Sequence, residues 1–145
     1  LRTDGANADF IKLVNLLDAD LAIRDGKEHD FYAQFNKIDL IHHVVLAYEN
    51  EIPAGCGAMK VFEKDCMEIK RMYVVPEFRK KGIAARVLLE LEQWASELFF
   101  YRCVLETGKK QPEAIALYMK NGYTPVANYG QYIGVDNSIC FEKKV

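Results

Sequence analysis

Three cations followed by a glycine form the segment whose residue types say most about chemistry: Arg79, Lys80, Lys81, Gly82, Ile83 and Ala84. If a helix starts here, its first amide groups lack partners within the helix, and the helix dipole adds partial positive charge. Gly82 has no side chain, so a phosphate can approach the backbone closely. The run therefore predicts a site for a phosphate-bearing ligand, with a solvated helix start as the alternative.

Other ligand classes are excluded by pattern and charge. The Walker loop G-x-x-x-x-G-K-[ST] and the dinucleotide fingerprint G-x-G-x-x-G are both absent. A net charge of −2 gives no basic field that would hold nucleic acid. No Cys or His cluster has the spacing of zinc ligands, so we expect no metal.

The composition indicates one globular domain over residues 1–145. Half of the residues are hydrophobic, which is ample for a packed core, and no apolar run is long enough to span a membrane. The cysteines fall in expected strands and predict buried free thiols: Cys56, Cys66, Cys103 and Cys140. Free thiols and the lack of a signal peptide predict a reducing, cytoplasmic location.

The elements around the cationic run are a strand, a helix and a strand. An apolar stripe at helical spacing predicts a helix over residues 79–100, formed by Ile83, Val87, Leu91, Trp94 and Leu98. Strand patterns precede it at residues 66–75 and follow it at residues 101–106. Such an order implies a right-handed parallel crossover.

The rest of the chain continues the alternation of helices and strands. Helices are expected at residues 7–23, 29–35 and 112–120, with Asn7 as the first cap and Gly122 as the last stop. Strands are expected at residues 42–49, 54–62, 123–127 and 138–144, the first two forming a meander with residues 66–75. Residues 1–4 supply at most the end of a first strand.

Two segments carry a resemblance to a known family. Residues 72–84, M-Y-V-V-P-E-F-R-K-K-G-I-A, resemble the signature of the GNAT superfamily of acyl-CoA-dependent N-acetyltransferases, and residues 79–84 match [RQ]-x-x-G-x-[GA]. Residues 111–123, Q-P-E-A-I-A-L-Y-M-K-N-G-Y, resemble its N-x-x-A-x-x-L-Y-x-x-x-G-[FY] helix. Ala84 replaces the commoner glycine, and Gln111 stands where the family usually has Asn. The resemblance covers nearly the whole chain.

The resemblance implies the family's fold and cosubstrate, acetyl-CoA. The fold is an α/β mixed sheet, largely antiparallel with one splayed parallel pair, flanked by about four helices. The diphosphate would lie on the amides of Lys81, Gly82, Ile83 and Ala84, with Arg79 and Lys80 nearby. The pantetheine arm would pair with Met72, Tyr73 and Val74 and contact Gln111. An amide of Tyr73 or Val74 would polarise the thioester carbonyl.

The same resemblance gives Tyr118 the role of protonating the departing thiolate. Its alternative is a core aromatic beside Ile115 and Leu117. Attack is expected to come directly from the amine, because no cysteine has an evident base beside it in sequence.

The proton of the attacking amine needs an acceptor, for which Glu68 is the first candidate and Glu106 the second. Glu68 lies an even number of residues before Met72 and Val74, which predicts one shared strand face. The alternative is a strand glutamate that faces Lys70, Arg71 or solvent.

The acceptor is expected to be a primary amine of a small molecule. The alternatives are a peptide or protein N-acetyltransferase, and a non-catalytic acyl-CoA-binding sensor. Tyr129 and Tyr132 are candidates for the acceptor side, or else packed tyrosines of a surface hairpin. The oligomeric state stays open, a homodimer through the final strands being one form.

Overall fold

The computed structural model describes residues 1–25 and 41–145. A seven-stranded sheet has the order β1-β2-β3-β4-β5-β7-β6, and its neighbouring strands are antiparallel except for β4 and β5. The strands are β1 (Arg2–Thr3), β2 (His43–Glu49), β3 (Ile52–Glu63), β4 (Cys66–Val74), β5 (Arg102–Gly108), β6 (Thr124–Val126) and β7 (Ser138–Lys144). This arrangement confirms the expected largely antiparallel sheet with one parallel pair.

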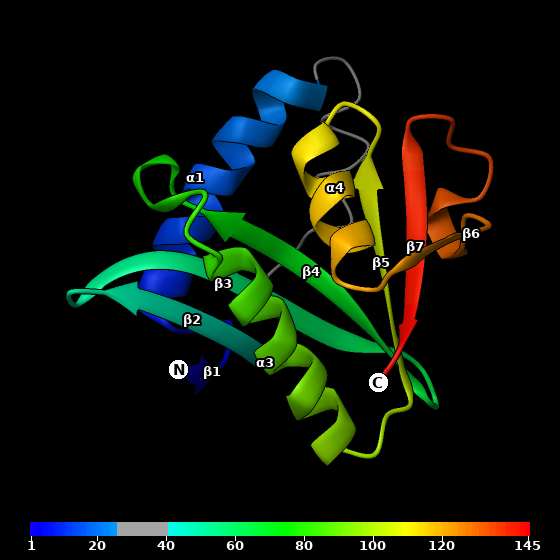
Figure 1. Ribbon diagram of the computed structural model, residues 1–145, viewed down its shortest axis with the longest axis horizontal. Coiled ribbons are helices and arrows are strands. Elements are labelled where there is room, and N and C mark those ends of the chain that lie inside the picture. Colours follow the sequence, from blue (N-terminus) through cyan, green and yellow to red (C-terminus); the bar gives the residue numbers. More distant parts are fainter. Residues whose placement is uncertain (26–40) are drawn as a thin grey trace.

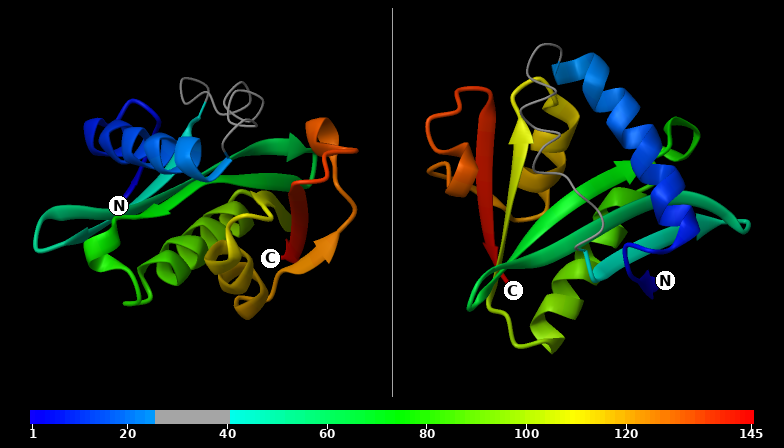
Figure 2. Two further views of the ribbon diagram at one scale, coloured as in Figure 1. Left: turned by 90° about the horizontal axis from the view of Figure 1, so that it is seen from above. Right: turned by 180° about the vertical axis from the view of Figure 1, so that it is seen from behind.

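Helices cover both faces of the sheet. Helix α1 (Ala8–Asp25) lies on one face, and α3 (Ile83–Glu97) and α4 (Pro112–Lys120) lie on the other (Figures 1 and 2). Two short 3-10 turns follow β4 and β6: η2 (Pro76–Phe78) and η3 (Gly130–Tyr132). The helix expected at residues 29–35 lies outside the described residues. The described part of the chain thus has three of the four expected helices.

Two apolar layers hold these elements together. The larger lies between the sheet and helices α3 and α4, and includes Leu91, Leu105 and Phe141. The smaller packs α1 against the opposite face through Phe10 and Val14. The side chain of Asn7 caps α1 as expected, because its Oδ1 accepts hydrogen bonds from the amides of Asp9 and Phe10 at 2.9 and 3.2 Å.

Helix α3 begins four residues later than the apolar stripe predicts. Its first residue is Ile83 and its last is Glu97, so the expected range of 79–100 is too long at both ends. The physical reason is backbone handedness: Lys80 and Gly82 have φ values of +65° and +79°, which a right-handed helix does not accommodate. Beyond the C-terminal end of the helix, Phe99 has a φ of +68°, which a right-handed helix does not accommodate either.

A bulge interrupts β4 at Arg71. Cys56 of β3 pairs with Tyr73 and Ala58 pairs with Lys70, so Arg71 and Met72 together oppose the single residue between them. Arg71 has a φ of +59°, a left-handed conformation that bends the strand. The parallel pairing of β4 with β5 ends just before the bulge, at Ile69 and Leu105. The two strands therefore separate beyond this point.

Gly57 faces the bulge, and its replacement tests how tightly the bulge is packed. An added Cβ would lie 2.5 Å from Sδ of Met72 and 2.8 Å from side-chain carbons of Leu91 and Val87. We expect Gly57→Ala to lower the free energy of unfolding by about 1–3 kcal/mol, measured by urea denaturation. Gly134→Ala gives the cost of backbone strain alone, because its φ is +80° and no atom of the described residues lies within 4 Å of its added Cβ. Gly57 has no positive φ, so its loss would come from crowding. An unchanged stability of Gly57→Ala would contradict the close packing.

Candidate active site

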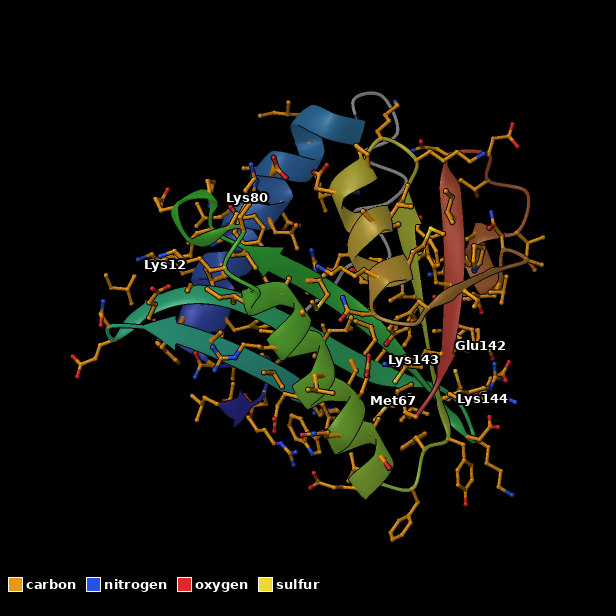
Figure 3. The ribbon with its side chains drawn as sticks, in the orientation of Figure 1. Lys12, Met67, Lys80, Glu142, Lys143 and Lys144 are labelled. Atoms are coloured by element: carbon orange, nitrogen blue, oxygen red, sulfur yellow. The ribbon has the colours of Figure 1, made fainter. Side chains whose placement is uncertain are left out.

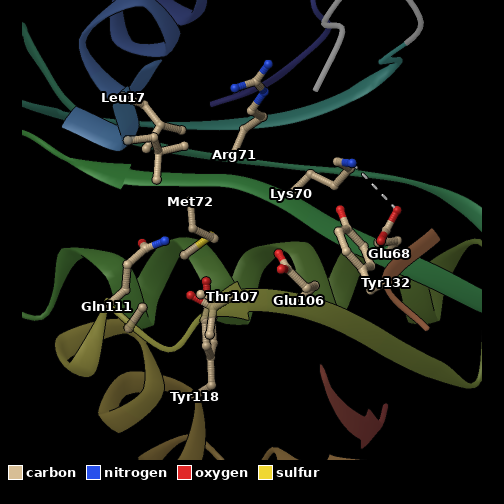
Figure 4. Close-up of a pocket in the computed structure, with 13 residues that line it drawn as sticks. Leu17, Glu68, Lys70, Arg71, Met72, Glu106, Thr107, Gln111, Tyr118 and Tyr132 are labelled. Atoms are coloured by element: carbon tan, nitrogen blue, oxygen red, sulfur yellow. Dashed lines mark ion pairs between the residues drawn. The ribbon is translucent and has the colours of Figure 1, made fainter. Parts of the chain in front are cut away.

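A cavity of about 110 Å³ occupies the gap where β4 and β5 separate (Figure 4). Its lining comes from α1, β4, β5, α4 and the turn η3, and includes Leu17, Leu21, Glu68, Lys70, Arg71, Met72, Glu106, Gln111, Tyr118 and Tyr132. Because α1 and α4 lie on opposite faces of the sheet, the cavity has walls from both faces.

The start of α3 leaves its amides open. No side chain caps it, and the first helical bond runs from the amide of Arg86 to the carbonyl of Gly82 at 3.1 Å. Within the described residues, the amides of Ile83 and Ala84 have no hydrogen-bond acceptor. An added Cβ at Gly82 would meet nothing within 4 Å. The helix start is therefore an exposed set of donors with the dipole behind it, which is the geometry that an oxyanion ligand needs.

The three cations of this segment are placed differently from one another. Nε of Arg79 donates to the carbonyl of Val74 at 2.9 Å, and its guanidinium lies over the ring of Tyr73. Nζ of Lys81 lies 3.2 Å from a carboxylate oxygen of Glu49. Lys80 extends from the loop between β4 and α3 (Figure 3). Arg79 therefore holds the end of β4, and Lys80 is the one of these three cations for which the described residues supply no partner.

Tyr118 on α4 lies both in the apolar core and at the cavity. It packs in the larger apolar layer, with its ring 5.9 Å from that of Tyr123 and 6.0 Å from that of Phe141. It also lines the cavity, below the gap between the strands (Figure 4). Burial raises the pKa of its phenol, so the hydroxyl stays protonated over the physiological range. Gln111, at the N-terminus of α4, lines the same part of the cavity.

Two carboxylates, of the buried Glu68 and the partly buried Glu106, stand on the other side of the gap. The hydroxyl of Tyr129 donates to Oε2 of Glu68 at 2.7 Å, and Nζ of Lys70 lies 3.9 Å from Oε1. The hydroxyl of Ser138 donates to Glu106. Burial, with the charge of Glu68 beside it, raises the pKa of Tyr129, so this hydroxyl remains a donor. Both carboxylates are thus held in place by neutral hydroxyl groups.

The expectation that Glu68 shares a face with Met72 and Val74 is wrong. Met72 and Val74 pack toward α3 in the larger apolar layer, whereas Tyr73 packs in the layer beneath α1. Before the bulge it is Ile69 that packs toward α3, so Glu68 next to it points to the opposite face. The bulge inserts one residue and inverts the alternation, so an even spacing across it no longer means a shared face.

Lys70 and Arg71 enter the site although the sequence analysis treated them only as neighbours of Glu68. Both are buried and line the cavity. Burial lowers the pKa of Lys70. The signal that could have found them is two successive cations in the middle of a strand, flanked directly by the apolar residues Ile69 and Met72.

The described residues hold no group of three His, Cys, Asp or Glu side chains that could bind a metal ion. In the same part of the chain, every helix is too short or too polar to cross a bilayer. All four cysteines are free and buried, as expected. Burial raises the pKa of the Cys56 and Cys103 thiols to about 12, which leaves them protonated and poorly nucleophilic.

Comparison with known proteins agrees with this geometry. Residues 11–123 match the model of the acetyltransferase (GNAT) family. The uncharacterized N-acetyltransferase YjgM of Escherichia coli (strain K12) is 40% identical over 81 residues, which cover 54% of this chain and 48% of YjgM. The IAA acetyltransferase of Azospirillum brasilense is 37% identical over 91 residues, 62% of this chain and 59% of that protein. The chain thus spans about half of these relatives.

Solved structures resemble the whole fold. A protein of Klebsiella pneumoniae assigned to the acyl-CoA N-acyltransferases superposes with a TM-score of 0.82 at 27% identity, covering 99% of this chain and 96% of that one. A GNAT family acetyltransferase of Elizabethkingia anophelis with acetyl-CoA bound gives a TM-score of 0.66 at 20% identity, covering 86% and 88%. At that identity the second likeness concerns the fold alone.

Proposed function

The chain belongs to the GNAT acetyltransferase family, and from this premise we propose that it transfers the acetyl group of acetyl-CoA to a primary amine of a small molecule. The observation that carries the proposal is the pairing of two features. The uncapped amides at the start of α3 suit a diphosphate, and the gap between β4 and β5 leads from there to Tyr118. The cosubstrate would supply an acetyl group on a thiolate that leaves readily once it is protonated.

In this proposal, backbone groups contribute more to the binding of acetyl-CoA than side chains do. We assign the diphosphate to the amides of Lys81, Gly82, Ile83 and Ala84, with Lys80 adding charge and Arg79 fixing the strand end. The β4 edge beyond Ile69 no longer pairs with β5, which leaves Met72, Tyr73 and Val74 for the pantetheine arm, beside Gln111. An amide of Tyr73 or Val74 would polarise the thioester carbonyl.

The chemical steps need one base and one acid. We assign the base to Glu68, which lines the cavity on the α1 side and would take a proton from the incoming ammonium group. Tyr118, on the opposite side of the gap, would donate its proton to the departing thiolate. The buried thiols argue against a covalent acyl-enzyme, so the amine would attack directly.

The acceptor is proposed to be a small molecule because the cavity is small. A volume of about 110 Å³ accommodates a compact group and favours it over a folded protein surface. The relative from Azospirillum brasilense is named for IAA, which supports the same class.

A direct assay tests the proposal. We expect acetyl-CoA-dependent release of free thiol when the protein is supplied with a panel of small primary amines. Thermal stabilisation by coenzyme A without turnover of any amine would instead indicate a non-catalytic sensor of acyl-CoA. Failure of both readouts would remove the proposed function.

Two matched substitutions identify the base. We expect Glu68→Gln to lower kcat by about 100-fold, because a positioned general base contributes at least this much. Glu106→Gln makes the same change to the second carboxylate and should lower kcat by less than about tenfold. Thiol release at saturating acetyl-CoA gives kcat for each variant. The reverse order of the two effects would assign the base to Glu106.

A further inference from the structure

The acceptor side of the cavity carries an equal number of positive and negative side chains. Glu68 and Glu106 supply two carboxylates, and Lys70 and Arg71 supply two cations. All except Glu106 are at least nine-tenths buried, so water screens their charges weakly. Side chains of both signs line the cavity, so a zwitterion would find an opposite charge for each of its two ends.

The carboxylates and the guanidinium of the cavity form hydrogen bonds with different elements of the fold. The carboxylates are bound by hydroxyl groups of Tyr129, which follows β6, and Ser138 of β7. Arg71 is bound from the other side, by Asp18 of α1, at 2.7 Å from its Nη1. The carboxylates of Glu68 and Glu106 are thus held from the side of β7, and the guanidinium of Arg71 lies on the α1 side, where Figure 4 shows it pointing away from Met72.

The Nε–H of Arg71 is a buried donor for which the described residues supply no acceptor. Asp18 occupies Nη1, but the buried Nε has no hydrogen-bond partner within the described residues. Burying a guanidinium N–H without an acceptor costs free energy, which an entering anion would recover. The left-handed backbone of Arg71 turns this side chain to the α1 face, in spite of the conformational cost to a residue other than glycine.

Resting on the proposed function, we infer that the acceptor is an amino-acid-like zwitterion whose carboxylate binds Arg71 and Lys70 while its ammonium group meets Glu68. A guanidinium and an ammonium group together form a strong carboxylate site. The carboxylate then fixes the direction in which the amine enters the gap, toward the position of the thioester. Bound in this way, the ligand adds one charge of each sign to the cavity.

Matched acceptors test the inference on the whole protein. Each of several small amino acids is assayed beside its carboxamide and its decarboxylated amine, by release of thiol from acetyl-CoA. We expect kcat/KM for the free amino acid to exceed that for both analogues by about tenfold or more, as for a lost charged hydrogen bond.

Two substitutions of Arg71 separate binding from folding. Asn tolerates the left-handed backbone, so Arg71→Asn removes the guanidinium and keeps the bulge. We expect it to reduce the preference for the carboxylate to within about threefold, mainly through KM of the amino acid. Arg71→Lys, which retains a cation, should keep part of the preference. Lys70→Met removes the second cation proposed to bind the carboxylate. We expect it to reduce the preference for the carboxylate as well, which keeps the test valid should either variant of Arg71 fold poorly.

The outcomes distinguish the two proposals. Equal turnover of amino acids, carboxamides and plain amines would overturn the zwitterion acceptor and leave acetyl transfer intact. A preference that survives both Arg71→Asn and Lys70→Met would place the carboxylate elsewhere and overturn the inference too. Absence of turnover with any acceptor would remove the proposed function, and the inference with it.

Discussion

Gly82→Glu is expected to weaken coenzyme A binding by about 100-fold or more, since it places a carboxylate at amides proposed to hold a diphosphate. The added side chain enters open space in front of α3, where no protein atom lies within 4 Å of its Cβ. The fold should persist, because a residue other than glycine at a φ of +79° costs only about 1–2 kcal/mol. Isothermal titration with coenzyme A measures the loss.

Gly82→Gln is the matched control for this variant. Glutamine has the same size as glutamate and meets the same backbone strain, but it carries no charge. We expect it to bind coenzyme A more weakly than the wild type and more tightly than Gly82→Glu. The difference in affinity for coenzyme A between the two variants should become smaller as salt is added, because ions screen exposed charges. Unchanged affinity of Gly82→Glu would show that the amides of α3 do not hold the cosubstrate.

Tyr118→Phe is expected to lower kcat by about 100-fold or more and to leave the affinity for acetyl-CoA almost unchanged. The substitution removes only the hydroxyl group, so the packing of the ring against Tyr123 and Phe141 is retained. The loss should appear in kcat because protonation of the thiolate belongs to the transition state and not to binding. Single-turnover measurements at saturating acetyl-CoA check this.

Tyr123→Phe serves as the comparison in the same apolar layer. Its hydroxyl donates to Glu92 at 3.0 Å, so we expect its loss to lower the free energy of unfolding by about 1 kcal/mol. Tyr123 does not line the described cavity, and kcat should therefore stay within about threefold of the wild type. A Tyr118→Phe variant as active as Tyr123→Phe would show that the role of Tyr118 is purely structural.

Most elements were predictable because their signals are local. The apolar stripe through Val87 and Leu91 marks one face of a helix whatever the rest of the chain does. Asn7 caps α1, and Gly122 ends α4 with a φ of +92°, as their residue types predict. The exact start of α3 was less predictable, because Lys80 adopts a left-handed backbone that its residue type does not favour.

The composition of the site was predictable only in part. Gln111 and Tyr118 both line the cavity, since the first caps and the second belongs to one short helix, and their roles toward the cosubstrate stay predictions. Lys70 and Arg71 were missed as cavity residues, because in a regular strand adjacent side chains point to opposite faces. The bulge turns Arg71 to the α1 side, which Lys70 already faces, and there Arg71 meets Asp18, 53 residues away in sequence.

The sequence by itself determined the kind of protein this is: the spacing of apolar residues sets the helices and strands, and the cationic run with Gly82 precedes the uncapped start of α3, to which we assign the diphosphate. Only the tertiary structure decided which charges face the reaction. That choice depends on a single residue inserted in β4, whose effect on side-chain direction exists only once β3 and β5 are paired beside it.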